Sequence, residues 1–193
     1  MQVHTPDVCR APPVVDIKSP GTRDDRIKAM ATHNDFSNGL PVDVPAATAW
    51  AALEHMEHWL PNLATVRSVE ADADAANFSR SSAVSPTNSV VLKTGHRYLV
   101  RTSEGPVMHC RIVEVDTGTG LVHIEARLGP LRSCLLCSVE PTGPCACVLR
   151  RRQTYPGMIG RLFTLCFGRR EGNETTAYLR AWADYARDLA DRR

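Results

Sequence analysis

Aromatic residues, lysines and long apolar runs are scarce in this sequence, and each shortage excludes a class of protein. Aromatic residues make up only 6% of the 193 residues. The 23 basic residues, nearly all arginine, are spread among 21 acidic ones, so the chain lacks the basic surface of a nucleic-acid-binding protein. No apolar run is long enough to cross a bilayer, and residues 1–10 lack the apolar core of a secretory signal. We therefore expect a cytoplasmic protein without nucleic-acid or membrane partners.

The chain has seven cysteines, and their odd number without an export signal favours free thiols over a disulfide framework. Cys134-x-x-Cys137 is followed by Cys145-x-Cys147, a spacing that raises the question of a zinc site. Residues three apart on a strand, however, point to opposite faces of the sheet, so four thiolates would not converge. We expect these cysteines to act as small apolar residues that fill space.

A second pattern that could bind a metal is His55-x-x-His58, which would place two imidazoles on one face of a helix, beside Glu54 and Glu57. Zinc catalysis needs a third ligand and usually the His-Glu-x-x-His spacing, which is absent. No Gly-x-Gly-x-x-Gly, P-loop or Gly-x-Ser-x-Gly pattern occurs either. We therefore predict no metal and no cofactor.

The sequence divides into a leader and one domain. Four prolines interrupt residues 1–35, which hold little to bury, so we expect a flexible leader with at most a short helix at Asp24–Ala31. Alternatively, this leader covers a pocket or the partner in a homodimer. Residues 36–193 are predicted to form a single domain, and such a length buries a core without a disulfide or metal.

The first half of the domain predicts short strands and helices in alternation. A strand around Leu40–Val44 ends at Pro45, which suits the start of a short helix. A second helical turn, Glu54–Leu60, precedes a strand at Val66–Glu70. The polar segment Ala71–Thr94 is expected to connect this strand to the next.

Five runs rich in Val, Ile, Leu and Tyr follow, joined by short connectors that contain Gly or Pro. No gap between them is long enough for a helix, so they predict an antiparallel meander. The predicted strands are Arg97–Thr102, Val107–Val115, Leu121–Leu128, Arg132–Val139 and Cys147–Tyr155.

The C-terminal segment predicts an amphipathic helix of about five turns. Its apolar residues recur every three or four positions, which places them in one stripe. They are Tyr178, Trp182, Tyr185 and Leu189.

Short motifs occur in a fixed order over about residues 36–190: Val42-Asp43-Val44-Pro45-Ala46 with Trp50, Trp59-Leu60-Pro61-Asn62-Leu63, Gly95 with Tyr98, Ile112–Asp116, and Gly157 with Gly160. In this order they resemble the START-like superfamily, also called SRPBCC, and within it the polyketide cyclase/dehydrase group. The resemblance implies an α+β helix-grip fold, START-like and Bet v 1-like, in which a curved antiparallel sheet wraps around a long C-terminal helix. A largely apolar cavity between sheet and helix would hold a small molecule.

The resemblance also implies a function, the cyclisation and dehydration of a hydrophobic polyketide-type intermediate. In the family, an inward arginine with hydroxyl or imidazole groups polarises carbonyls, and a base removes the α-proton. On the last strand, we expect the face that carries Leu149, Arg151, Gln153 and Tyr155 to point inward. The candidate catalytic residues are His109, Arg111, Gln153 and Tyr155, and the candidate ligand-binding residues are Trp59, Tyr98, Arg151 and Trp182.

Two departures from the family pattern bear on this assignment. Val113 stands near the position of the family's catalytic arginine, and Gln153 near a histidine that some members use, so His109 or Arg111 would have to substitute. Periodicity leaves open which face of their strand points inward, and Arg111 could instead pair with Glu125 across the outer face of a hairpin. The alternative function is a non-catalytic carrier of a lipid-like ligand, with an almost wholly apolar cavity.

Overall fold

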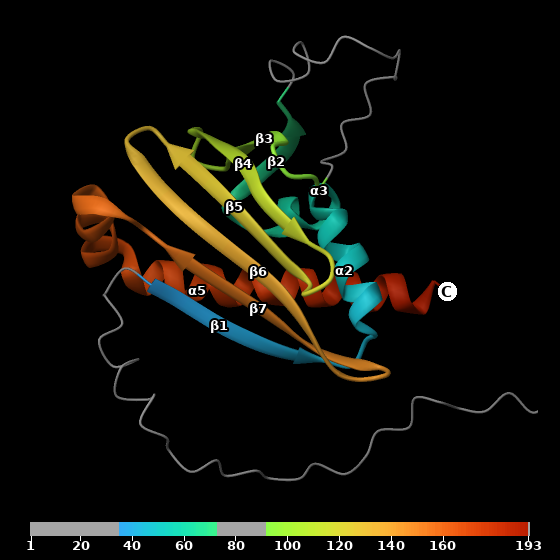
Figure 1. Cartoon of the computed structure of the whole chain (residues 1–193). Coiled ribbons are helices and arrows are strands. Elements are labelled where there is room, and N and C mark those ends of the chain that lie inside the picture. The colour runs from blue at the N-terminus through green and yellow to red at the C-terminus, as the bar shows by residue number, and fades with distance from the viewer. Residues whose placement is uncertain (1–34, 73–91, 193) are drawn as a thin grey trace, which may run out of the picture. The chain divides into compact units, whose positions relative to one another are not determined.

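Seven antiparallel strands form one sheet, in the order β1-β7-β6-β5-β4-β3-β2 (Figure 1). The computed structural model describes residues 35–72 and 92–192, all within the unit His33–Arg193. Along the chain, the elements are β1 (Asp35–Val42), α2 (Ala46–Glu54), α3 (Met56–Trp59), the 3-10 turn η1 (Leu60–Asn62), β2 (Val66–Ala71), β3 (Arg97–Thr102), β4 (Val107–Asp116), β5 (Leu121–Leu128), β6 (Leu131–Gly143), β7 (Ala146–Thr154) and α5 (Gly157–Asp191).

Two predicted segments lie wholly or mostly outside the described residues. The leader, residues 1–35, falls there except for Asp35, together with the short helix expected at Asp24–Ala31. Most of the predicted connection Ala71–Thr94 falls there as well. No helix in the described part of the chain combines the length and apolar character needed to cross a membrane.

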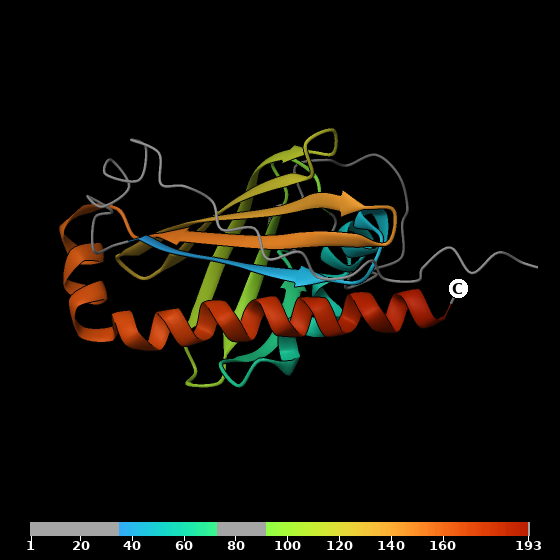
Figure 2. The same ribbon diagram turned by 90° about the horizontal axis from the view of Figure 1, so that it is seen from below.

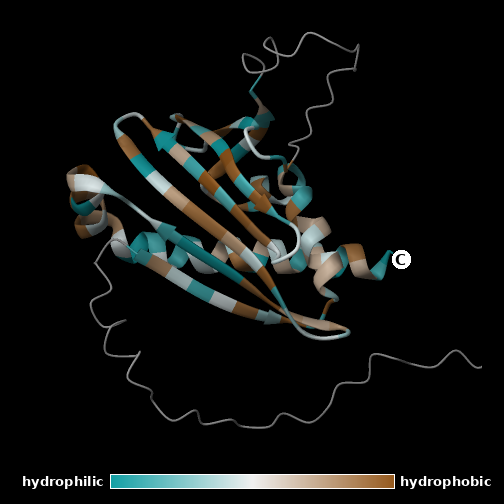
Figure 3. Cartoon of the chain, in the orientation of Figure 1, coloured by the Kyte–Doolittle hydropathy of each residue, from teal (hydrophilic) through white to brown (hydrophobic). Residues whose placement is uncertain are grey.

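The predicted meander is confirmed, since β3 to β7 correspond to the five predicted strands. Only β6 runs clearly longer, to Gly143 rather than Val139. Apolar and polar residues alternate along these strands (Figure 3), so one face of the sheet is buried and the other meets solvent. Gly120 and Gly129, with φ of +65° and +57°, occupy tight hairpin turns where a left-handed backbone favours glycine.

The C-terminal helix is confirmed but is longer than predicted, 35 residues from Gly157 to Asp191. Its last half carries the predicted apolar stripe, and Figure 2 shows it running along one side of the sheet. The first turns, drawn in orange, run at a steep angle to the rest (Figure 2). The pattern of apolar residues could not reveal these turns, because most of those residues do not lie on the buried face: Met158, Ile159, Leu162, Leu165 and Phe167 are all exposed.

The densest part of the core lies between α2, α3 and the last half of α5. Trp59 and Trp182 are fully buried, and their parallel rings have centroids 6.4 Å apart. The indole Nε1 of Trp59 donates to the Ala52 carbonyl at 2.7 Å, and that of Trp182 donates to the Ala49 carbonyl at 2.9 Å. Both rings therefore fix the short helices to α5 while keeping their polar atoms satisfied.

Three of the cysteines fill space in this core as predicted, whereas Cys145, which was also expected to be a free thiol, is disulfide-bonded. Cys110, Cys137 and Cys147 are buried on the inner face of the sheet. Burial raises the pKa of the Cys110 thiol to about 12 and that of Cys147 to about 11. The thiols are therefore neutral at physiological pH, and none of these three is an activated nucleophile.

Candidate ligand cavity

A cavity of about 330 Å³ lies between the inner face of the sheet and the first half of α5. Its wall comes from β2 to β7, from η1 and from α5, and most of its side chains are apolar. Leu60 and Leu63 border it from the segment before β2, and Phe163 and Phe167 border it from α5. This volume lies at the lower end of the range for small-molecule sites.

The inner face of β7 supplies the polar part of the wall. Because side chains alternate along a strand, Leu149, Arg151 and Gln153 share one face, and Tyr155 follows just after the strand. This is the face that the sequence predicts to point inward, and the structure confirms it, since Leu149, Arg151 and Tyr155 are buried.

These side chains form one hydrogen-bonded chain that ends on α5. Arg151 Nη1 donates to Thr175 Oγ1 at 2.6 Å, and its Nη2 donates to Gln153 Oε1. Gln153 Nε2 donates to the Tyr155 hydroxyl at 2.7 Å, and that hydroxyl donates to Glu171 Oε2. A guanidinium and a carboxylate thus lie at opposite ends of one chain along the cavity wall.

Arg151 is a buried cation with spare donor capacity. Its side chain is only 7% exposed, and its guanidinium carbon lies 4.6 Å from the centre of the Tyr178 ring. Among the described residues, Arg151 makes no ion pair with a carboxylate, and its Nε has no hydrogen-bond partner. A buried donor without a partner is costly. The guanidinium is therefore a buried charge at the cavity wall whose hydrogen-bonding capacity is not fully used.

Tyr155 is held as a neutral hydrogen-bond donor. Burial raises its pKa well above the usual value, and the charge of Glu171 and the hydrogen bond to it raise it further. The nearby Arg151 charge opposes this rise only in part. Gly160, at the start of α5, packs so closely on Tyr155 that a side chain there would collide with the Tyr155 carbonyl. The hydrogen bonds therefore hold the phenol, and the close approach of Gly160 holds the Tyr155 backbone against the start of α5.

Polar side chains at the edge of the cavity connect α5 to the other wall. Arg170 Nη2 lies 2.7 Å from Glu104 Oε1 in the loop between β3 and β4, and both side chains are largely exposed. Thr65 Oγ1, just before β2, donates to Glu174 Oε2 at 3.0 Å. These contacts bridge the edge of the cavity without burying a charge.

The structure brings four of the predicted site residues to the cavity: Tyr98, Arg151, Gln153 and Tyr155. Burial raises the pKa of Tyr98 well above its usual value, so it too stays neutral. Trp59 and Trp182, predicted to bind the ligand, are instead packed in the core beside the cavity and do not border it. Their rings are already covered on all sides by protein.

The expectation that His109 and Arg111 reach the cavity is corrected by the structure. Both are exposed on the outer face of β4, because Cys110 and Ile112 occupy the inner face. Arg111 lies directly opposite Glu125 of β5, which is the alternative arrangement considered from the sequence. Neither residue can therefore substitute for an inward arginine.

Two residues of the polar chain, Glu171 and Thr175, did not emerge from the sequence. With Tyr178 and Trp182 they continue the buried stripe of α5 backwards at a spacing of three or four residues. This spacing is the signal that could have identified them, because it places them on the face of the helix that meets the sheet. The stripe simply becomes polar where the cavity begins.

Comparisons with known proteins identify the fold. No family model matches the sequence, and no curated protein matches it. Among solved structures, a hypothetical protein from Helicobacter pylori is 13% identical with a TM-score of 0.62, covering 92% of this chain and 99% of that one. Norcoclaurine synthase from Thalictrum flavum is 15% identical with a TM-score of 0.57, covering 95% and 100%. The protein Ara h 8.0201 is 12% identical with a TM-score of 0.55, covering 80% and 97%. Together with the seven-stranded antiparallel sheet and its long C-terminal helix, these likenesses establish the α+β helix-grip fold of the Bet v 1-like kind.

Proposed function

We propose that the protein is a cyclase/dehydrase-like enzyme that binds a hydrophobic small molecule with a carbonyl oxygen in this cavity. The observation that carries the proposal is the buried guanidinium of Arg151, which has an unpartnered Nε. A cation in an apolar cavity stabilises negative charge on a carbonyl oxygen far better than water does. The rest of the wall supplies apolar surface for the carbon skeleton.

The polar chain can supply the proton transfers that ring closure requires. The Glu171 carboxylate accepts the α-proton of one carbonyl, whose enolate oxygen is stabilised by Arg151. The enolate carbon attacks a second carbonyl carbon, and Tyr155 donates its proton to the oxygen that becomes an alcohol. Glu171, now protonated, returns its proton to Tyr155, so both groups are restored. Loss of water from the alcohol then completes the dehydration.

The binding step can be tested with two fluorescent probes of similar size. Anilinonaphthalene sulfonate carries an anionic group, and phenylnaphthylamine does not. In Arg151→Met, which keeps the apolar volume, we expect the affinity for the sulfonate to fall at least about tenfold, since a charge-assisted hydrogen bond contributes roughly 1.5–3 kcal/mol. The affinity for phenylnaphthylamine should change much less. Arg150→Met is the matched control, because Arg150 is the neighbouring arginine and is exposed on the outer face.

A non-catalytic carrier is the second candidate, and the predominantly apolar wall favours it. The carrier uses Arg151 only to hold a polar head group, and it needs no base. Both functions predict the probe binding described above. They differ in whether the Tyr155–Glu171 pair moves a proton on a bound ketone. If Arg151→Met bound both probes like the wild-type protein, neither function would place its ligand beside this guanidinium.

A further inference from the structure

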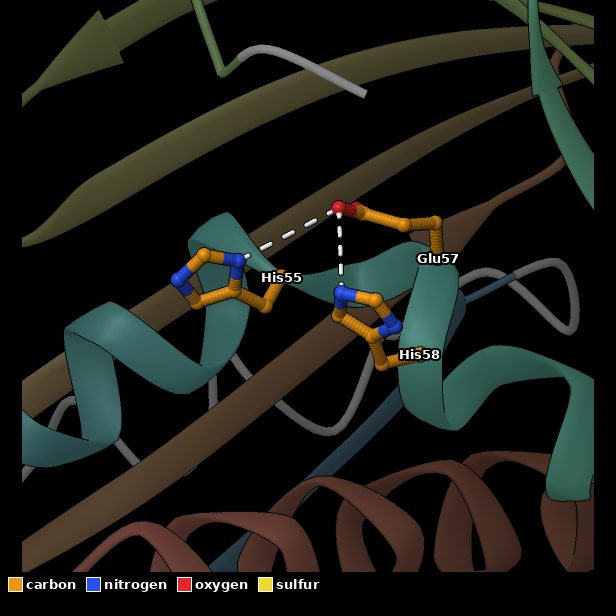
Figure 4. Close-up of side chains that lie close together, drawn as sticks. All are labelled: His55, Glu57 and His58. Atoms are coloured by element: carbon orange, nitrogen blue, oxygen red, sulfur yellow. Dashed lines mark ion pairs between the residues drawn. The ribbon is translucent and has the colours of Figure 1, made fainter. Parts of the chain in front are cut away.

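Outside the cavity, the described residues contain one group of three side chains that could hold a metal ion: His55, Glu57 and His58. Their ligand atoms all lie within 4.8 Å of one another. Glu57 Oε1 lies 4.0 Å from His55 Nδ1 and 3.7 Å from His58 Nε2, and Figure 4 shows both imidazoles turned toward the same carboxylate. None of the three borders the cavity, so the cluster is a separate feature of the molecule.

A break between two helices brings the three side chains together. Residues two apart on a continuous helix do not face each other, so His55 and Glu57 would diverge if α2 continued into α3. His55 lies between the two helices, with φ of −107° and ψ of 37°, and this conformation turns its side chain toward Glu57. The sequence showed the two histidines at helical spacing, with Glu57 next to His58 in the chain but not on their face of a continuous helix. The third ligand appears because the helix is interrupted.

Glu57 is an unusual carboxylate because one of its oxygen atoms, Oε2, is buried without a donor. Its side chain is only 9% exposed, and Oε2 has no hydrogen-bond partner. Among the described residues Oε1 accepts no hydrogen bond either, since the two imidazole nitrogens lie at distances longer than a hydrogen bond. No lysine or arginine of the described residues forms an ion pair with it. A buried carboxylate of this kind lacks compensation for its lost hydration. A cation bound between the three side chains would compensate for this lost hydration.

The imidazoles are placed to complete such a site. The ring of His58 stacks on Tyr185 of α5, with centroids 6.2 Å apart and planes 25° apart, which limits its orientation. The side chains of His55 and His58 are 51% and 60% exposed, so solvent reaches the cluster and a water molecule can act as a further ligand. Two imidazoles, one carboxylate and one water are a ligand set that tetrahedral Zn²⁺ accepts.

We propose that His55, Glu57 and His58 form a binding site for Zn²⁺. Zinc–ligand distances of about 2.0–2.2 Å imply about 3.4 Å between ligand atoms. The ligand atoms already lie within 4.8 Å of one another, so the side chains need only small rotations to close on the ion. Through His58 and Tyr185, the ion would fasten the junction of α2 and α3 to the last half of α5. The site stabilises the fold and is independent of the chemistry proposed for the cavity.

The test uses the full chain without a histidine tag, titrated with zinc chloride by isothermal calorimetry and followed by thermal unfolding. We expect one Zn²⁺ per chain, and at 100 times Kd a rise of Tm on the order of 5 °C. His55→Ala and His58→Ala should each weaken binding at least tenfold. His96→Ala is the matched control, because His96 is exposed and belongs to no such group.

Glu57→Gln distinguishes zinc binding by Glu57 from a purely structural role of this residue. It removes the buried charge and keeps the shape, so the metal-free variant should unfold at the same or a higher temperature than the wild-type protein. Zinc should no longer raise that temperature. X-ray absorption of the wild-type complex should show two imidazoles with oxygen ligands and no sulfur. Sulfur ligands, no rise of Tm with zinc, or zinc binding that persists in both His55→Ala and Glu57→Gln would overturn the proposal.

Discussion

The two halves of α5 face the same sheet but meet it in different ways. The last half, Tyr178–Asp191, packs Tyr178, Trp182 and Ala186 against α2 and α3 with almost no exposed apolar surface. The first part, Gly157–Arg170, exposes Met158 at 86% and Leu165 at 83% and borders a cavity. We refer to them as the packed half and the open half.

This difference separates the part of α5 that stabilises the fold from the part that borders the cavity. In the packed half, Trp59 and Trp182 fill the space between helix and sheet, so every buried atom has close neighbours. In the open half, smaller side chains of the sheet leave the space unfilled, and polar groups of β7 reach into it. Substitutions in the packed half should therefore act on folding, and those beside the cavity should act on the ligand.

The largest effect on stability is expected from Trp182→Ala. This change removes a fully buried ring and leaves the Ala49 carbonyl without its donor. We expect a loss of about 3–5 kcal/mol in the free energy of unfolding, measured by chemical denaturation. Leu165→Ala in the open half is the control and should change it by less than about 0.5 kcal/mol. Similar losses in the two variants would contradict the distinction between the halves.

Alkaline pH should weaken the fold through the buried thiol of Cys110 beneath the cavity. Burial raises its pKa to about 12 in the folded protein, against 9.0 ordinarily. The folded state therefore holds this proton after the unfolded state has released it, and stability falls as the pH rises above 9. Thermal unfolding from pH 8 to 11 should show a shallower fall in Cys110→Ala than in the wild-type protein. Cys166→Ala, which changes an exposed thiol, should follow the wild-type curve, and a parallel fall of all three would refute this assignment.

The smallest effect is expected at the edge of the open half. Arg170→Met breaks the exposed pair with Glu104, and exposed ion pairs contribute about 0–1 kcal/mol. We expect the free energy of unfolding to change by less than about 0.5 kcal/mol in chemical denaturation at physiological salt. A loss above about 2 kcal/mol would mean that the edge of the cavity, like the packed half, supports the fold.

Strands and helices could be predicted from the sequence where their apolar residues lie on a single face. The strands β3 to β7 could be predicted because their apolar residues alternate, and the packed half because Tyr178, Trp182, Tyr185 and Leu189 form one stripe. The orientation of β4 could not be predicted, because valines beside His109 and Arg111 make its outer face half apolar as well. Only the packing of Cys110 and Ile112 against the core decides it.

The site was predictable only in part, for related reasons. The inner face of β7 carries Leu149 and ends at Tyr155, so the sequence could place Arg151 and Gln153 correctly. A tryptophan suits a cavity wall and a solid core equally well by composition, and here Trp59 is in the core. The approach of Glu57 to His55 depends on a helix break that no proline or glycine marks.

The proposed function requires that the cavity perform proton chemistry on a bound carbonyl compound. The most direct test is hydrogen–deuterium exchange at the α-carbon of β-tetralone, an apolar bicyclic ketone, in deuterium oxide, followed by mass spectrometry. We predict that the wild-type protein accelerates this exchange, and that Glu171→Gln lowers the acceleration at least about a hundredfold while tetralone still binds. Arg150→Met should exchange like the wild-type protein. Binding without any acceleration by the wild-type protein, or full activity in Glu171→Gln, would contradict the account and favour a carrier.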